Sequence, residues 1–261
     1  MAVGLMDIKG QYAELQDRIE AAVLAVLRSG RVILGPNVKG FEDEAAAFLG
    51  TTGAVGVANG TDGLTIALRA LDVGPGDEVI TVPFTFYATP EAIAQTGARP
   101  VFVDILPDTL TMDPAAVEAA VTSRTRAIMP VDLFGLPCAA DAIDAVAKAH
   151  GLAVIEDCSQ AHGALYRGRL VGTLGDLAAF SLMGGKHHTS GGQGGMVITN
   201  DEALYWQAKR FADRGKPFGS TATSNLFLGL NYRMTELQAT IGRVQLGRLE
   251  GVLERRRALV A

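Results

Sequence analysis

The sequence predicts an α/β protein in which a mostly parallel sheet is covered by helices on both faces. Short runs rich in β-branched residues alternate with segments whose apolar residues recur with a helical period of about 3.6. Several of these runs are apolar throughout, as expected for strands buried on both faces. The predicted strands span residues 54–58, 78–82, 100–105, 127–134, 152–157, 178–183 and 196–200. Their alternation with helices favours a seven-stranded sheet sandwiched between two helical layers.

Helix-capping signals delimit the segments between these strands. Asp113 and Pro114 are typical of an N-cap and a first helical position, and Gly151 follows a helical pattern where a C-terminal glycine belongs. An amphipathic helix is predicted near residues 11–28. The last two strands are joined by a loop with no helical pattern, so we expect the final strand to run antiparallel to its neighbour.

The C-terminal stretch has the pattern of one long helix, from residue 235 to residue 261. It ends without a cap, a glycine or a polar tail, the signals on which helices usually stop. We therefore expect that the chain is cut before a second domain into which this helix leads. The alternative is a frayed C-terminal helix.

Composition narrows the class of protein. The 261 residues are 48% hydrophobic and 20% charged, which is ordinary for a soluble protein with a sizeable core. A net charge of −5 without a basic block argues against binding to nucleic acid or anionic lipid. Two cysteines are too few for a disulfide framework, and no stretch has the length of a signal peptide core or a membrane span. We expect a cytoplasmic protein.

The first candidate ligand site is the turn Asn59-Gly60-Thr61, between a predicted strand and a predicted helix. In an open α/β sheet, ligands bind in loops at the carboxyl ends of the strands. Backbone N–H groups at a helix N-terminus and the Thr61 hydroxyl suit a phosphate group. The alternative is a plain turn with an N-cap, which this stretch alone favours.

Two further strand ends carry residues with a chemical role. Glu156 and Asp157 end a strand, and because side chains alternate, only one of them can face a given side. A buried carboxylate needs a cationic partner, either a protonated heterocyclic nitrogen or an arginine. The aromatic side chains of Phe84, Phe86 and Tyr87 follow another strand; one of them either stacks on a planar ring or fills the core.

The segment SLMGGKHHTSGGQGGMVITND, residues 181–201, contains a lysine between glycines. It is not a P-loop, because Phe180 stands where that motif needs its first glycine and His187 follows Lys186. It is a poor zinc site, because adjacent histidines rarely converge on one ion, and no metal is predicted. Lys186 is either a solvated side chain or, in this confined loop, a desolvated amine that acts as a nucleophile.

Together these segments resemble the DegT/DnrJ/EryC1/StrS family of pyridoxal-phosphate enzymes, mostly sugar aminotransferases of fold type I. The resemblance covers nearly the whole chain, and the order and spacing of its blocks make it specific. The blocks are GQYAEL, SGRVILGP, VANGTDGLTIALRALDVGPGDEVITVPFTFYATPEAI, PVFVDI, VIEDCSQAHGA, GTLGDLAAFS and GLNYRMTELQA. The resemblance implies an N-terminal helical segment over 1–35, the cofactor-binding large domain over 36–240, and the start of a helix over 241–261 that leads to a missing C-terminal small domain.

The resemblance also implies roles for individual residues. Lys186 would be the lysine that holds pyridoxal 5′-phosphate through a Schiff base and shuttles the proton, and Asp157 would pair with the ring nitrogen of the cofactor. The other cofactor-binding residues would be Gly60, Thr61 and Ser181 at the phosphate, Gln160 near the ring hydroxyl, Phe86 stacked on the ring, and Asn231 reaching the phosphate from the neighbouring subunit. That last role implies a homodimer with shared active sites.

The implied activity is transfer of an amino group from glutamate or glutamine to a keto sugar, commonly nucleotide-linked, with pyridoxamine phosphate formed between two half-reactions. One alternative is a sugar dehydratase, because such relatives carry histidine at the lysine position and His187 and His188 stand next to it here. Another is a non-catalytic, cofactor-binding regulator. The stretch KHHTSGGQGG departs from the family pattern, in that Gln193 replaces an acidic residue. This departure concerns the substrate class more than the cofactor chemistry.

Overall fold

The computed structural model describes residues 6–260. Residues 1–5 and 261 lie outside this description. They include the start of the helical segment predicted over 1–35 and the end of the one predicted over 241–261. Within the described residues, no helix combines the length and the apolar character needed to cross a membrane.

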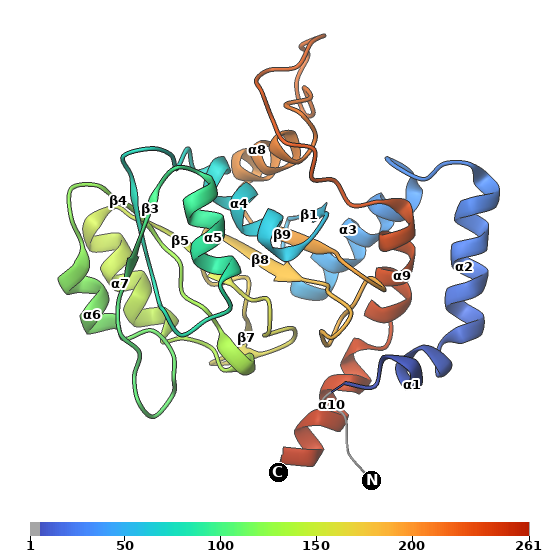
Figure 1. Ribbon diagram of the computed structural model, residues 1–261, viewed down its shortest axis with the longest axis horizontal. Coiled ribbons are helices and arrows are strands. Elements are labelled where there is room, and N and C mark those ends of the chain that lie inside the picture. Colours follow the sequence, from blue (N-terminus) through green and yellow to red (C-terminus); the bar gives the residue numbers. More distant parts are fainter. Residues whose placement is uncertain (1–5, 261) are drawn as a thin grey trace.

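A seven-stranded sheet forms the centre of the molecule, as the sequence predicts (Figure 1). Its strand order is β1-β9-β8-β5-β4-β2-β3, and every neighbouring pair is parallel except the two that involve β9. The antiparallel final strand is therefore confirmed. The strands are β1 (Gly53–Val57), β2 (Glu78–Thr81), β3 (Arg99–Phe102), β4 (Thr125–Ile128), β5 (Ala153–Asp157), β8 (Leu177–Ser181) and β9 (Gly195–Thr199).

Helices cover both faces of the sheet. The helices are α1 (Ile8–Ala13), α2 (Gln16–Ser29), α3 (Pro36–Leu49), α4 (Gly60–Ala70), α5 (Ala88–Gln95), α6 (Pro114–Ala120), α7 (Ala140–His150), α8 (Glu202–Ala212), α9 (Glu236–Leu246) and α10 (Leu249–Val260). One face packs against α4, α5 and α8 through a core cluster that includes Leu64 and Ile155. The other face packs against α3 and α9 at one end, and against α6 and α7 at the other. A short 3-10 helix (Leu133–Gly135) and a small hairpin of β6 (Leu165–Tyr166) and β7 (Arg169–Leu170) lie outside the sheet.

Several predicted elements have different bounds in the structure, and for two of them the physical reason is plain. The single helix predicted over 235–261 is wrong, because α9 ends at Leu246 and α10 starts at Leu249. Glycine has a weak helical propensity, and at this break Gly247 caps α9 while the Arg248 guanidinium bonds back to Gln245 Oε1 at 3.0 Å. The strand predicted over 127–134 ends at Ile128, because Pro130 has no N–H to continue the ladder.

The segment between α8 and α9 projects from the body of the protein, and Figure 1 shows it above α8. Its base is fixed by the buried Asp213 carboxylate, which forms salt bridges with Lys216 at 2.8 Å and Arg233 at 3.1 Å. Leu228 is fully exposed on the stretch of chain that returns to this base, where the Leu230 N–H donates to the Phe211 carbonyl at 2.8 Å. The segment therefore has a firm base and an outer part, residues 219–225, that is exposed and mostly polar.

Glu236 joins the start of α9 to the start of α3. Its side chain is completely buried and accepts hydrogen bonds from the backbone N–H groups of Gly35 (2.9 Å), Asn37 (2.8 Å) and Val38 (3.0 Å). The N-terminal N–H groups of a helix have no acceptor within the helix, so a carboxylate at this point satisfies them and favours the helix dipole. A Cβ on Gly35 would lie 2.6 Å from the Glu236 carboxyl carbon, so this approach requires glycine.

Replacing Glu236 with glutamine is expected to lower the free energy of unfolding by about 2–4 kcal/mol. The amide offers one acceptor oxygen and turns a donor toward backbone donors, which leaves buried N–H groups without a partner. Urea unfolding of Glu236→Gln, with the exposed Glu250→Gln as a matched control, measures the effect. Equal stabilities for the two variants would contradict this role of Glu236.

Candidate active site

One cavity of about 710 Å³ lies at the carboxyl ends of the parallel strands. Seven of the eight residues proposed from the sequence to bind a cofactor line it, namely Gly60, Thr61, Phe86, Asp157, Gln160, Ser181 and Lys186. Asn231 does not line the cavity; it is exposed at the base of the projecting segment, where its Oδ1 accepts a hydrogen bond from Arg233 at 2.9 Å. The fold thus brings together residues that are far apart in sequence, such as Gly60 and Lys186, which are separated by 126 positions.

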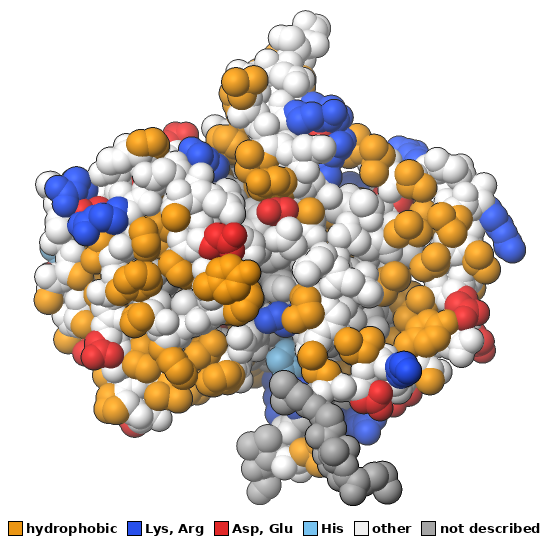
Figure 2. All heavy atoms as spheres, viewed as in Figure 1, with side chains coloured by type: hydrophobic (Ala, Val, Ile, Leu, Met, Phe, Trp, Pro, Cys, Tyr) orange, Lys and Arg blue, Asp and Glu red, His pale blue; other side chains and the backbone are white. Residues whose placement is uncertain are grey.

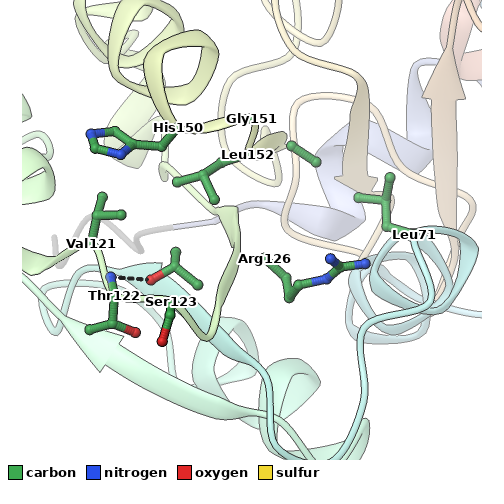
Figure 3. A pocket seen from close by; sticks show the side chains of 10 residues that line it. Leu71, Val121, Thr122, Ser123, Arg126, His150, Gly151 and Leu152 are labelled. Atoms are coloured by element: carbon green, nitrogen blue, oxygen red, sulfur yellow. Dashed lines mark hydrogen bonds between the residues drawn. The ribbon is translucent and has the colours of Figure 1, made fainter.

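A second cavity, of about 700 Å³, lies at the opposite edge of the sheet, near the starts of β4 and β5 (Figure 3). None of the residues predicted to bind a cofactor lines it. Its histidine, His150, pairs with Glu118 at 2.8 Å, and its Thr122 N–H donates to Thr125 Oγ1 at 2.9 Å. The chemistry-bearing side chains therefore gather in the cavity at the carboxyl edge.

The N-terminus of α4 forms one end of that cavity. Asn59 caps the helix by accepting from the Asp62 N–H at 2.9 Å, so the following turn presents its first N–H groups outward. A Cβ on Gly60 would lie 2.8 Å from Ser181 Cβ, and a Cβ on Gly195 would lie 2.5 Å from the Asn59 carbonyl oxygen. These glycines let the α4 turn, the end of β8 and the start of β9 pack closely. The Thr61 and Ser181 hydroxyls therefore line the same end as the helix N-terminus, which suits an anion.

Asp157 ends β5 and is 4% exposed. Its Oδ2 accepts a hydrogen bond from Thr89 Oγ1 at 2.7 Å, and its Oδ1 accepts from the Ser159 N–H at 3.1 Å. The preceding Glu156 points to the other side, where its carboxylate accepts from the N–H groups of Gly172, Leu174 and Gly175 at 2.8–2.9 Å. The structure thus confirms that one of the two carboxylates is structural and assigns Asp157 to the cavity.

Lys186 lies in the loop after β8 and is half-buried. Burial lowers the pKa of its amine below the usual range, and the nearby Asp157 carboxylate opposes that shift. A lowered pKa increases the fraction of unprotonated amine, which is the nucleophilic form. Lys186 is therefore a partly buried lysine at the cavity, which is the environment that the nucleophilic alternative expects.

The two histidines after Lys186 have other environments. His188 is fully buried, its Nε2 donates to the Gly242 carbonyl at 2.9 Å, and burial lowers its pKa to about 4. It therefore ties the lysine loop to α9 as a neutral imidazole. His187 lines a neighbouring cavity of about 580 Å³ that shares Gln160 with the first. Neither histidine lines the cavity of Lys186 and Asp157.

The aromatic residues after β2 do not fill the core. Phe86 and Tyr87 are 62% and 66% exposed, and their ring centroids lie 4.5 Å apart at the cavity. Phe84 contacts Phe134 edge to face, with the centroids 6.3 Å apart. The core-filling alternative is therefore wrong, and these rings are free to contact a ligand or another chain.

Asp132 is a buried carboxyl that the sequence reasoning missed. Its Oδ1 accepts from the Cys138 N–H at 2.9 Å, and its Oδ2 accepts from Cys158 Sγ at 3.6 Å. Burial is the main reason that the pKa of Asp132 rises to about 7. Because this folded-state pKa lies above the unfolded value, the protonated form stabilises the fold at low pH, and this contribution is lost as the pH rises toward and through 7.

Replacing Asp132 with asparagine is expected to remove this pH dependence. An asparagine accepts at Oδ1 and donates at Nδ2, as a protonated carboxyl does, so the variant should gain stability relative to the wild type between pH 5 and pH 8. The expected gain is on the order of 1–4 kcal/mol. Urea unfolding at several pH values checks it, and parallel stability curves for the two proteins would contradict it.

The fold is that of the pyridoxal-phosphate aminotransferases of fold type I. Within that class, the sequence pattern of the DegT/DnrJ/EryC1/StrS aminotransferase family matches residues 13–261, and the chain belongs to this family. Pyridoxal 5′-phosphate is the cofactor of the family.

Individual relatives are similar over nearly the whole chain. A pleiotropic regulatory protein of Geobacillus stearothermophilus is 46% identical over 258 residues, which are 98% of this chain and 68% of that protein. A dTDP-3-amino-3,4,6-trideoxy-alpha-D-glucose transaminase of Streptomyces venezuelae is 44% identical, over 99% of this chain and 68% of that protein. The crystal structure of S. venezuelae DesV superimposes with a TM-score of 0.90 at 44% identity, covering 95% of this chain and 66% of that one. The chain therefore spans about two-thirds of the length of these relatives.

The residues present fit the cofactor. The close packing of Gly60 on Ser181 leaves an end at α4 that suits an anion, and the buried Asp157 carboxylate forms no salt bridge among residues 6–260. A carboxylate buried in this way needs a cationic partner, and a protonated ring nitrogen provides one. The amine of Lys186 and the exposed ring of Phe86 line the same cavity.

Proposed function

We propose that this chain carries the cofactor-binding and catalytic residues of an aminotransferase that moves an amino group from glutamate or glutamine to a keto sugar. The observation that supports this most strongly is the placement of a partly buried lysine amine and a buried aspartate in one cavity whose other end, at the N-terminus of α4, suits an anion. An amine of lowered pKa and a buried carboxylate that forms no salt bridge among residues 6–260 are groups that suit pyridoxal-phosphate chemistry.

The role proposed for each residue comes from the family resemblance, and its place in the cavity supports it. When bound, pyridoxal phosphate supplies an aldehyde that takes up the amino group and a ring that accepts electrons. Lys186 Nζ holds the cofactor and moves a proton, because burial keeps part of the amine unprotonated. Asp157 holds the proton on the ring nitrogen. Gly60, Thr61 and Ser181 would bind the phosphate, and Phe86 and Gln160 would contact the ring.

The proposed acceptor is a nucleotide-linked keto sugar. The transaminase relative that is 44% identical is named for a dTDP-linked amino sugar, and other relatives are named for UDP-linked sugars. The cavity wall adds the polar side chains of Tyr87, Glu91 and Gln193, which suit the hydroxyl groups of a sugar.

The positions of the two histidines argue against the dehydratase alternative. That chemistry would use a histidine in place of the cofactor-holding lysine, but the cavity is lined by Lys186, and His188 is buried against Gly242. The 46% identical relative named as a regulatory protein keeps the regulatory alternative open to test. A regulator would bind the cofactor without turning over a keto acceptor.

A homodimer with shared active sites is part of the proposal. Hydrophobic side chains gather around the hollow on the face drawn in Figure 2, and Phe86, Tyr87 and Phe134 are more than 60% exposed. Asn231 lies outside the cavity of its own chain, at the base of a projecting segment. This position is compatible with a contact to the cofactor of a partner subunit. Light scattering of the purified protein is expected to give twice the chain mass, and a monomer at micromolar concentration would contradict the dimer.

Two half-reactions test the function separately. Adding glutamate or glutamine to the cofactor-loaded protein is expected to convert pyridoxal phosphate to pyridoxamine phosphate, which absorption spectra and mass spectrometry detect. Adding dTDP- or UDP-linked 3-keto sugars is then expected to restore pyridoxal phosphate and release an amino sugar. Cofactor binding without either conversion would favour the regulatory alternative.

A further inference from the structure

Thr89 contacts Asp157 from another element of the fold. It is the second residue of α5, and its side chain is 1% exposed although it lines the cavity. Its hydroxyl lies 2.7 Å from Asp157 Oδ2, across 68 positions of sequence. A hydrogen bond to a carboxylate is shorter and stronger than a bond between neutral groups.

The direction of this hydrogen bond is fixed by chemistry. A carboxylate only accepts, so the Thr89 hydroxyl donates its single proton to Asp157. Thr85 Oγ1 lies 2.9 Å from Thr89 Oγ1, and because the Thr89 proton is already used, Thr85 must donate to Thr89. The two hydroxyls therefore form a chain that ends on Oδ2, in which each bond polarises the next.

Few other groups set the orientation of the Asp157 carboxylate. Its second oxygen accepts only the Ser159 N–H, at 3.1 Å, among the hydrogen bonds of the described chain. No salt bridge to Asp157 occurs between residues 6 and 260. Rotation about the Cβ–Cγ bond of an aspartate is soft, so one strong contact at Oδ2 decides which way the carboxylate faces.

We propose that Thr89 is a positioning residue whose hydroxyl holds the Asp157 carboxylate toward the ring nitrogen of the cofactor. Thr85 supports it by donating to Thr89, and Ser159 fixes the second oxygen. This inference rests on the proposed function, because it assumes that Asp157 pairs with that nitrogen. It predicts that the affinity for pyridoxal phosphate depends on the Thr89 hydroxyl only through Asp157.

The test is the dissociation constant of pyridoxal phosphate, measured by fluorescence titration of cofactor-free protein. Thr89→Val keeps the shape of the side chain and removes the hydroxyl, and we expect the dissociation constant to rise about 10-fold or more. Thr89→Ser keeps the hydroxyl and therefore the hydrogen bond, so its dissociation constant is expected to stay within about 3-fold of the wild-type value. Thermal unfolding of the cofactor-free variants shows whether each has folded.

A double-mutant cycle separates positioning from a general structural effect. In an Asp157→Ala background, Thr89→Val is expected to change the dissociation constant less than about 2-fold, because the partner is gone. An equal loss in both backgrounds, or wild-type affinity for Thr89→Val, would overturn the positioning role alone. If the wild-type protein bound no pyridoxal phosphate, the proposed function itself would fail, and the role of Thr89 with it.

Discussion

Replacing Lys186 with alanine is expected to lower the rate of amino transfer by about 10³-fold or more. Lys186 supplies the amine of this cavity, and burial gives it the lowered pKa that a nucleophile and proton acceptor needs. General acid–base catalysis by one group contributes roughly 10²–10⁴-fold, and the loss of covalent attachment adds to it. We expect alanine to leave the loop intact, because backbone hydrogen bonds hold it. The Lys186 N–H donates to the Met183 carbonyl at 2.9 Å, and the Gly184 N–H donates to the Gly192 carbonyl at 2.9 Å.

The measurement for Lys186→Ala is the rate of each half-reaction under single-turnover conditions. Lys148→Ala is a suitable control, because Lys148 is exposed on α7 and pairs with Asp144 one turn away. The control should react like the wild type. A Lys186→Ala protein that transfers amino groups within about tenfold of the wild-type rate would contradict the catalytic role, since general acid–base groups contribute far more than that.

Replacing Asp157 with asparagine is expected to lower amino transfer by about 10²-fold or more and to weaken cofactor binding. The amide keeps the size of the side chain and accepts the Thr89 hydrogen bond, but it carries no charge to hold a proton on the ring nitrogen. A neutral ring accepts electrons poorly, so the proton-transfer step that follows slows. The loss of activity in Asp157→Asn is expected to be smaller than that in Lys186→Ala, because the amine that attaches the cofactor remains.

For Asp157→Asn, the absorption spectrum of bound pyridoxal phosphate and the rates of both half-reactions are the relevant measurements. The exposed Asp108→Asn serves as the matched control, since Asp108 lies on the surface away from the cavity. Unchanged rates in Asp157→Asn would show that another group protonates the ring. Reduced rates in both variants alike would point to a general effect of the substitution.

The sequence predicted the layers of the fold well because strand burial leaves a strong pattern. Runs such as AVIED are apolar until their last residues, and the helix from Gly60 begins after a capping asparagine. Element ends were less predictable where one backbone feature overrides the pattern. Pro130 stops a strand whose apolar run continues, and Gly247 with Arg248 interrupts a helix whose periodicity does not change.

The site residues likewise divide into those that the sequence reveals and those that only the structure reveals. Asp157 stands at the end of a strand and Lys186 in the loop after the next strand of the sheet, and the family resemblance supplied their roles. Thr89, Asp132 and Glu236 were missed because their partners are far away in sequence and their residue types are common. The Thr89 hydroxyl meets a carboxylate 68 positions later, and Glu236 bonds to amides about 200 positions earlier. Only the folded chain brings such groups together.

The location of the cofactor attachment tests the central claim most directly. The purified protein is loaded with pyridoxal phosphate, reduced with borohydride, digested and analysed by mass spectrometry. The proposed function predicts a pyridoxyl group on the peptide that contains Lys186, and its loss as pyridoxamine phosphate when glutamate or glutamine is added before reduction. A pyridoxyl group on a different lysine, or none at all on protein that binds the cofactor, would contradict the assignment of this cavity as the active site.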